Sequence, residues 1–383
     1  MQRTAPRLDF LELFLDQIGV QLQLSDTQVK EAESHYDAVS KWLGAPGSPL
    51  ARLDPNIYAQ GSLRLKTTVK PIGRDEYDLD LVFEVARWDT GGPEDLLKTV
   101  YNRIMASDTY KGIVESPLPR CVRLSYSKQF HLDIVPARKA PGNGDHIEIP
   151  DRLGSGSYRW KPSNPKGYSE WFEAAATMPV KLTELRASIE PMPEQESFAV
   201  KPPLRRLVQL LKRWRDCRLK GKDAEVSSII LTTLAGHTYQ KETTVGDSLT
   251  AFLERTTATF RAATQPPIIM NPANEQEVIS EKWSKEPGTF EAFRAQLDVF
   301  KQEWYVVRDG ATDPVKRTKL LNSLFGDELT ATSSKKATAA VESLRNSGRL
   351  GVIGSTGALS SGMRTVAVPR NTFYGDDPAR KAD

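Results

Sequence analysis

Acidic residues alternate with aliphatic residues in two strand-like segments of this chain. Asp78 and Asp80 flank a leucine and lead into an apolar run, and Asp133 interrupts a second apolar run at 131–135. Successive side chains of a strand point to opposite faces, so Asp78 and Asp80 share one face while the neighbouring leucines enter the core. By the same alternation, Asp133 points away from its aliphatic neighbours. The pattern predicts three carboxylates that converge on one side of a sheet.

A Gln-Gly-Ser turn at 60–62 precedes the paired aspartates. The backbone N–H groups of Gly61 and Ser62, with the serine hydroxyl, can form a small nest for phosphates. Taken alone, a Gly-Ser pair is usually only a turn, and an Asp-x-Asp segment is more often a solvated strand edge. Taken together with a third aspartate, they are the parts that bind two magnesium ions and a nucleoside triphosphate.

Composition narrows the class of protein. The 383 residues suffice for two lobes, and 39% hydrophobic with 26% charged residues argues against disorder throughout. No apolar run approaches about 18 residues and no basic-then-apolar leader is present, so we expect no membrane span and a cytoplasmic protein. Two distant cysteines and four scattered histidines argue against a disulfide framework and a zinc ribbon.

The net charge of +3 is unevenly distributed, because residues 331–383 carry eight Lys/Arg against four Asp/Glu. The rest of the chain is close to neutral. A protein that coats duplex nucleic acid must neutralise many phosphates, so this balance does not fit such a role.

Residue periodicity predicts a mixed α and β chain followed by helices. The Gly-, Pro- and Ser-rich stretch at 142–166 is typical of a loop. We expect three parts, namely a catalytic lobe at 1–200, a helical lobe at 201–330 and a flexible tail at 331–383. Helices are predicted at 10–18, 25–44 (with a capping box), 94–106, 204–214, 226–239, 275–283, 289–305 and up to about 325, and strands at 56–60, 78–85, 121–126 and 130–136.

The blocks at 60–68, 75–82 and 132–136 resemble the active-site blocks of polymerase-β-like nucleotidyltransferases. More narrowly, they resemble those of the bacterial cGAS/DncV-like enzymes (CD-NTases), relatives of oligoadenylate synthetase. The resemblance is specific across 57–136 and continues more loosely to about 325. It implies an α+β, bilobal fold with a small mixed sheet and a helical C-terminal lobe.

The resemblance also implies a function. Such an enzyme makes cyclic di- or oligonucleotide signals from ATP and/or GTP in CBASS anti-phage defence, using two Mg²⁺ ions, or Mn²⁺, on Asp78, Asp80 and Asp133. Asp78 and Asp80 would bridge both ions, and Asp133 would bind the ion under the acceptor hydroxyl. Without a zinc ribbon, no long DNA activator is expected.

Further binding residues follow from the same resemblance. The donor triphosphate would contact Lys212 as well as the turn formed by Gln60, Gly61 and Ser62. A serine at the start of the next helix would also touch phosphate; we assign Ser227, although Ser227 or Ser228 could equally cap that helix.

Some residues near these blocks have ordinary interpretations. Arg206 and Arg213 are expected on the solvated face of the helix that carries Lys212. The aromatic residues Tyr158, Trp160 and Tyr168 can stack on a base, but burial in the core is the favoured interpretation.

Two rival functions use the same residues. One is a single-turn nucleotidyltransferase that modifies RNA or a protein, as toxin-like relatives do, and the other is a catalytically silent scaffold with this fold. The near-neutral body and the resemblance in the helical half favour the cyclase.

The tail ends in a compact apolar segment. Residues 331–383 are rich in Ser, Thr and Gly, with a short possible helix at 337–346 and apolar residues at 366–374. This pattern is typical of a tethered motif for a protein partner, or of a segment that docks onto the enzyme itself.

Overall fold

The structure is a computed structural model. It describes residues 9–73, 76–126, 130–142, 144–177, 190–195, 201–309, 312–352, 359–360 and 366–367. Contacts divide the chain into two compact units. The larger unit covers Leu22–Val306, and the smaller unit combines Met1–Gln21 with Val307–Asp383.

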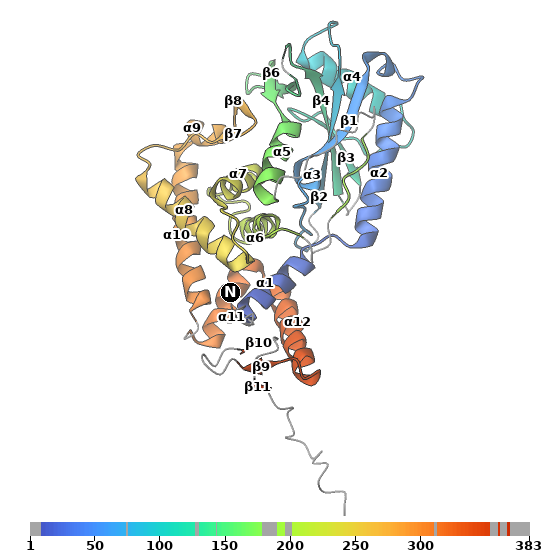
Figure 1. Ribbon diagram of the computed structural model, residues 1–383. Helices are drawn as coiled ribbons and strands as arrows, with labels where there is room; N and C mark the ends of the chain where they lie inside the picture. Colours follow the sequence, from blue (N-terminus) through green and yellow to red (C-terminus); the bar gives the residue numbers. More distant parts are fainter. Residues whose placement is uncertain are drawn as a thin grey trace, which may run out of the picture. The chain divides into compact units, whose positions relative to one another are not determined.

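The larger unit contains a six-stranded mixed sheet (Figure 1). β2 and β4 run parallel, and every other pair of neighbouring strands is antiparallel. β3 and β5 both pair with β4, at different points along it. The path runs through β1 (Pro55–Gln60), β2 (Tyr77–Val85), β4 (Phe130–Lys139), β5 (Ile147–Arg152) and β6 (Tyr158–Ser163), with β3 (Val122–Tyr126) beside β4.

Two helices cover one face of this sheet, as Figure 1 shows. They are α2 (Asp26–Gly44) and α4 (Pro93–Met105). Their apolar stripes join Leu79, Leu81 and the alternate residues of the other strands in one core cluster. The even-numbered residues of β2, including both aspartates, therefore belong to the opposite face, as the alternation predicted. The predicted capping box of α2 is present at Ser25.

The rest of the larger unit is mainly helical. It contains a short α3 after β1 and a small hairpin, β7–β8. Its elements are α3 (Gly61–Arg64), α5 (Pro165–Ala176), α6 (Pro203–Arg218), α7 (Ser228–Thr238), α8 (Val245–Ala262), β7 (Met270–Asn271), β8 (Asn274–Val278), α9 (Glu281–Lys285) and α10 (Pro287–Arg308), whose last residues belong to the smaller unit.

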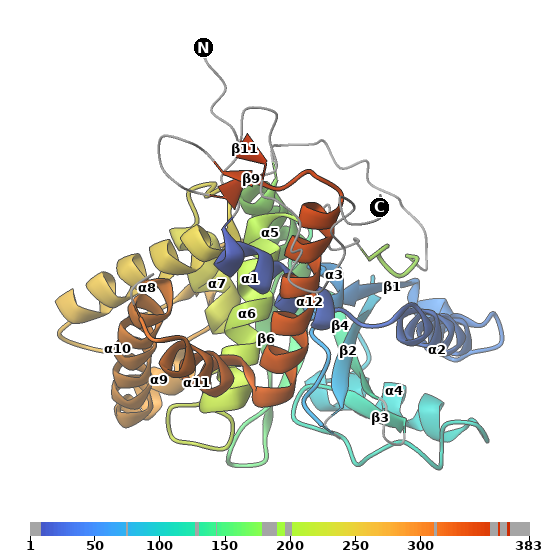
Figure 2. The same cartoon turned by 90° about the horizontal axis from the view of Figure 1, so that it is seen from below.

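The smaller unit joins the two ends of the chain. In it α1 (Phe10–Gln21) lies against α12 (Asp327–Asn346), which follows α11 (Pro314–Phe325), and both views show the pair side by side (Figure 2). Short strands also pair here. They are β9 (Gly351–Val352), β10 (Leu359–Ser360) and β11 (Val366–Ala367).

The structure corrects several predicted elements. The predicted loop at 142–166 contains β5 and β6, and the predicted helix at 275–283 is β8 followed by α9. The strands at 142–166 were missed because their polar residues show no strand period. At 275–283, pairing with a neighbouring strand outweighed the helical periodicity of the sequence. α8 was not predicted. α12 starts at Asp327 and has buried residues, so part of the segment predicted to be flexible is a packed helix.

Among the residues that the structure describes, no helix is long and apolar enough to cross a membrane.

Candidate active site

The three predicted aspartates lie on two neighbouring strands. Asp80 of β2 is the register partner of Asp133 of β4, and Asp78 stands two residues before Asp80. The parallel pairing of β2 and β4 brings residues 53 positions apart to one level of the sheet. The structure therefore gathers the three carboxylates on the same face, opposite α2 and α4.

Gly61 passes close to this cluster. Its φ is +61°, and a Cβ there would lie 2.3 Å from Asp80 Oδ2. Only glycine suits a position that combines a left-handed backbone with such a close approach. The next residue, Ser62, has its Oγ 3.2 Å from Thr68 Oγ1. The turn that was predicted to hold phosphates thus lies directly beside one of the metal-ligand candidates.

The carboxylates of β2 are held in an unfavourable environment. Burial, followed by repulsion from Asp133 and Asp78, raises the pKa of Asp80 to about 7. Burial and Asp133 also raise the pKa of Asp78, against the lowering effect of Arg123. A site that penalises its own negative charges gains when a cation binds.

Arg123 is the direct partner of the third aspartate. It faces Asp133 across the β3–β4 pair, and its Nε and Nη2 each donate to one carboxylate oxygen at 2.7 Å. Its Nη2 also lies 3.6 Å from Asp78 Oδ1.

The residues fit magnesium in chemical type. Carboxylates on rigid strands are the ligands that magnesium prefers, and the raised pKa values of Asp78 and Asp80 mark a place where positive charge is favourable. Within the described residues, however, no group of three acidic, His or Cys side chains is already arranged around a metal position. Asp133, the third carboxylate, is engaged with Arg123 instead.

Lys212 of α6 approaches from the helical side. Its Nζ donates to the Thr67 carbonyl at 3.0 Å and to Thr67 Oγ1 at 3.2 Å. Burial, then repulsion from Arg215, lowers its pKa to about 7. Lys212 thus fixes the segment after Ser62 and also lines the cavity described below. Two neighbours bind the same segment: Gln209 donates to the Thr68 carbonyl, and Arg213, which is buried rather than solvated as predicted, donates to that of Lys70.

The start of α7 separates the two candidate serines. Ser227 is the N-cap residue, but its side chain makes no capping hydrogen bond, and Ser227 is not part of the cavity lining. Ser228 lines the cavity and accepts a hydrogen bond from Arg215 Nη1. Arg215, one helical turn after Lys212, also pairs with Asp216 at 2.6 Å.

A cavity of about 440 Å³ connects these groups within the larger unit. Gln60, Gly61, Ser62, Asp78, Asp80 and Lys212 all line it, so most predicted site residues share one space. Asp133 does not line it but lies level with Asp80.

Another part of the cavity wall carries a partly buried acidic group. Glu277 of β8 lines it, and its Oε2 accepts a hydrogen bond from Asn271 Nδ2 at 2.8 Å. Burial raises the pKa of Glu277, although hydrogen bonds from Asn271 and Ser163 oppose the shift. The ring of Tyr168 lines the same cavity, and its hydroxyl is hydrogen-bonded to Thr233 Oγ1 at 2.9 Å. A carboxylate beside an aromatic ring is suited to a planar ligand with N–H donors.

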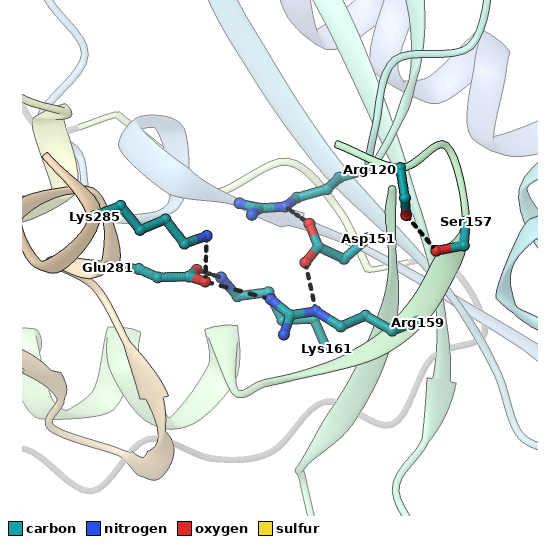
Figure 3. Close-up of polar contacts among 8 residues, drawn as sticks. Arg120, Asp151, Ser157, Arg159, Lys161, Glu281 and Lys285 are labelled. Carbon is teal, nitrogen blue, oxygen red and sulfur yellow. Dashed lines mark hydrogen bonds and ion pairs between the residues drawn. The ribbon is translucent and has the colours of Figure 1, made fainter. Parts of the chain in front are cut away.

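An ion-pair network joins β5 and β6 to α9 beside this wall (Figure 3). Asp151 accepts from Arg120 Nε at 2.7 Å and from Arg159 Nε at 2.9 Å. Burial of Asp151 is outweighed by these hydrogen bonds, so its pKa is lowered. Glu281 pairs with Lys285, Arg159 and Lys161, and the hydrogen bond from Lys285 is the largest cause that lowers its pKa to about 2. The network anchors Arg120, which lines the cavity.

Several residues in or near the cavity escaped the sequence analysis. Arg215 could have been found from its i,i+3 spacing to Lys212, which places both on one helix face. Arg123 could have been found by alternation, once β3 was paired with β4. For Glu277 the sequence carried no signal, because it lies on a strand that was predicted as a helix.

Comparison with known proteins gives consistent results. Residues 11–175 match the family described as the Second Messenger Oligonucleotide or Dinucleotide Synthetase domain. A c-di-GMP synthase of Roseivirga ehrenbergii is 30% identical over 374 residues, which cover 96% of this chain and 97% of that protein. The cyclic dinucleotide synthase CdnG of Bradyrhizobium diazoefficiens is 26% identical over 352 residues, 86% of this chain and 84% of that protein.

Solved structures show the same fold. The structure of Bradyrhizobium diazoefficiens CdnG in complex with GTP superposes with a TM-score of 0.69 at 25% identity, covering 86% of this chain and all of that one. The cyclic AMP-GMP synthase DncV of Vibrio cholerae gives a TM-score of 0.57 at 13% identity, over 85% of this chain and 98% of that one, which is a likeness of fold.

Proposed function

This chain belongs to the bacterial CD-NTase family of cGAS/DncV-like nucleotidyltransferases, and we propose that it makes cyclic di-GMP from two molecules of GTP. The family assignment makes it an enzyme that synthesises a cyclic nucleotide from nucleoside triphosphates. The observation that carries the choice of GTP is the likeness, along nearly the whole chain, to a c-di-GMP synthase. The likeness to a CdnG solved with GTP supports it.

We assign the reaction to the cavity residues. Asp78, Asp80 and Asp133 would hold two magnesium ions, which when bound lower the pKa of the attacking hydroxyl and stabilise the departing pyrophosphate. Gly61 and Ser62 would hold the donor triphosphate with backbone N–H groups and a hydroxyl.

The helical side would complete phosphate binding. Lys212 and Arg215 bring positive charge to the cavity, and Ser228 lies within it. Gln60 borders the same turn. Ser227, the serine assigned from the sequence, would act only if its side chain turned toward the cavity, so Ser228 is the better candidate.

Glu277 supports guanine as the base. The Watson–Crick edge of guanine offers two adjacent donors, N1–H and N2–H, and an ionised carboxylate accepts both. Adenine presents an acceptor at N1 and so cannot pair with a carboxylate in this way. A site built to accept two hydrogen bonds rejects a ligand that lacks the donors.

Product analysis tests the proposal. Purified protein with GTP alone and magnesium, without any macromolecular acceptor, should give a phosphatase-resistant product with the mass of cyclic di-GMP. Comparable incorporation of labelled ATP in a nucleotide mixture would contradict the choice of GTP. A requirement for RNA or protein acceptor would instead favour the single-turn enzyme, and absence of turnover would favour the silent scaffold.

A matched pair of variants tests Glu277. Glu277→Gln replaces one acceptor by a donor and should lower kcat/KM for GTP roughly 10- to 100-fold relative to ATP. Glu275→Gln changes an exposed residue of the same strand and should leave this ratio unchanged. Equal effects of the two substitutions would remove Glu277 from base recognition.

We further propose a place in CBASS anti-phage defence in the cytoplasm, without a long DNA activator. A protein partner at the C-terminal segment remains part of this proposal. Phe373 and Tyr374, which belong to the apolar segment expected to bind a partner or to dock onto the enzyme itself, lie outside the described residues.

A further inference from the structure

Arg123 connects two of the carboxylates that we assign to the metal ions. Its guanidinium donates to both oxygens of Asp133 at 2.7 Å and approaches Asp78 to 3.6 Å. Asp133 is 8% exposed, and the two hydrogen bonds from Arg123 engage both of its carboxylate oxygens. A single side-chain cation therefore occupies a position between ligands that two-metal chemistry requires.

A second arginine on the same sheet, Arg138, provides a comparison. Arg138 of β4 pairs with Glu148 of β5, but its Nε and Nη2 both approach Oε2 alone, at 2.8 and 2.7 Å. Its guanidinium also covers the ring of Trp160, at 4.1 Å from the centroid. Arg138 thus contacts one carboxylate oxygen and an aromatic ring. Arg123, in contrast, donates to both carboxylate oxygens of Asp133 and lies near a second aspartate.

Arginine cannot release Asp133 by losing its proton, because its pKa remains above about 12 in proteins. It can only share an oxygen or move aside. Either the guanidinium of Arg123 or a metal ion stabilises the ionised Asp133, because its carboxylate is buried beside other negative charges. A metal ion on Asp133 must therefore share a carboxylate oxygen with Arg123 or displace one of its two hydrogen bonds.

We propose that Arg123 is a positioning residue that competes with the acceptor-side metal ion for Asp133. It holds the third carboxylate in place, offsets its charge while the ion is not bound, and raises the metal concentration that the enzyme needs. This inference rests on the proposed assignment of the three aspartates as metal ligands, but not on the identity of the base.

Manganese binding in the absence of nucleotide tests the competition directly. Free and bound Mn²⁺ would be measured by electron paramagnetic resonance on the full chain and on Arg123→Gln. The variant should bind Mn²⁺ on the order of tenfold more tightly, equivalent to about 1.4 kcal/mol. It should also have a lower Tm in EDTA than the wild type, and Mn²⁺ should raise its Tm by more.

Arg138→Gln is the matched control. It also removes an arginine from an ion pair of this sheet, so it should lower the Tm without changing the affinity for Mn²⁺. The double variant Arg123→Gln/Asp133→Asn should lose the gain in affinity, because the contested carboxylate is gone.

Arg123→Lys keeps the test possible if the glutamine variant does not fold. Lysine retains the charge but not the two-pronged contact, so Mn²⁺ should bind more tightly than to the wild type. Unchanged or weaker Mn²⁺ binding in the folded Arg123 variants would overturn the proposal and make Arg123 a fixed support of the loaded site. If Asp78→Asn and Asp80→Asn also leave Mn²⁺ binding unchanged, the metal-site assignment itself fails.

Discussion

The cavity has an acidic wall and a basic wall that were built in different ways. The acidic wall consists of Asp78 and Asp80 on one strand, level with Asp133 on the next. The basic wall, with Lys212 and Arg215, belongs to a helix more than 120 residues further along the chain. Strand alternation alone fixes the direction of the first pair, whereas the second is placed only by the packing of α6.

The two walls also carry opposite electrostatic penalties. Burial and like charges raise the pKa of Asp80 and lower the pKa of Lys212, each to about 7. The environment of each wall thus disfavours the charged form of its residues. The metal ions of a metal–triphosphate complex would stabilise the acidic wall, and its phosphates would stabilise the basic wall. The charges of both walls are therefore unfavourable in the absence of a ligand, and they become favourable when a ligand of opposite charge binds beside each wall.

Removing the acidic wall should have the largest effect. The double substitution Asp78→Ala/Asp80→Ala should reduce product formation by at least about 10³-fold, because it removes the charges that would hold both metal ions. Folding should survive, since Asp78 is exposed, Asp80 is only partly buried, and the substitution relieves repulsion among neighbouring carboxylates. Circular dichroism and a product assay check both parts. Near wild-type synthesis by the double variant would break the assignment of this wall.

Weakening the basic wall should cost less. Lys212→Ala should lower kcat/KM by an amount equivalent to roughly 1.5–3 kcal/mol of transition-state stabilisation, as expected for the loss of one charge-assisted contact. Arg206→Ala on the same helix is the control, because Arg206 does not line the cavity. Steady-state kinetics with varied GTP would measure both. An equal loss in the two variants would make Lys212 an ordinary helix charge.

The pH dependence of thermal stability tests whether the charge of Asp80 is unfavourable in the folded protein. The pKa of Asp80 rises from 3.8 to about 7 on folding, so the folded protein holds its proton to higher pH than the unfolded chain. The wild type therefore loses stability as pH rises across that window. Asp80→Asn removes this loss and should raise the Tm in EDTA more at pH 8 than at pH 4.

An exposed carboxylate provides the control for that measurement. Asp108→Asn, outside the cavity, should shift the Tm little and similarly at both pH values. If Asp80→Asn behaves in the same way, the acidic wall does not carry the penalty inferred for it.

Changes outside both walls should have the smallest effect on synthesis. All residues that line the cavity belong to the larger unit, so removing residues 347–383 should leave in-vitro activity nearly intact. Removing 331–383 instead cuts through α12, which contacts α1, and should lower the Tm. Product assays and thermal unfolding of the two truncations separate these outcomes. Loss of activity on removing 347–383 would show that the site depends on the last segment.

Local sequence patterns correctly predicted the elements in which the burial of apolar side chains follows a regular period. β2 and β4 were predicted because buried aliphatic residues alternate with the aspartates, and α2 because a capping box precedes a regular apolar stripe. The same reasoning failed where pairing outweighed local preference. β5 and β6 contain too many polar and proline residues to show a strand period, and α12 was predicted too short because its stripe consists of small residues.

The sequence by itself determined that Asp78 and Asp80 share a face, that Asp133 points away from the core, and that a Gly-Ser turn stands beside them. These facts depend on alternation and on glycine's freedom at positive φ, which act over a few residues. Only the tertiary structure decided that Arg123 holds Asp133, that Ser228 rather than Ser227 lines the cavity, and that Glu277 lies in its wall. Those choices depend on strand register and helix packing between segments up to about 200 residues apart, where no local pattern carries the information.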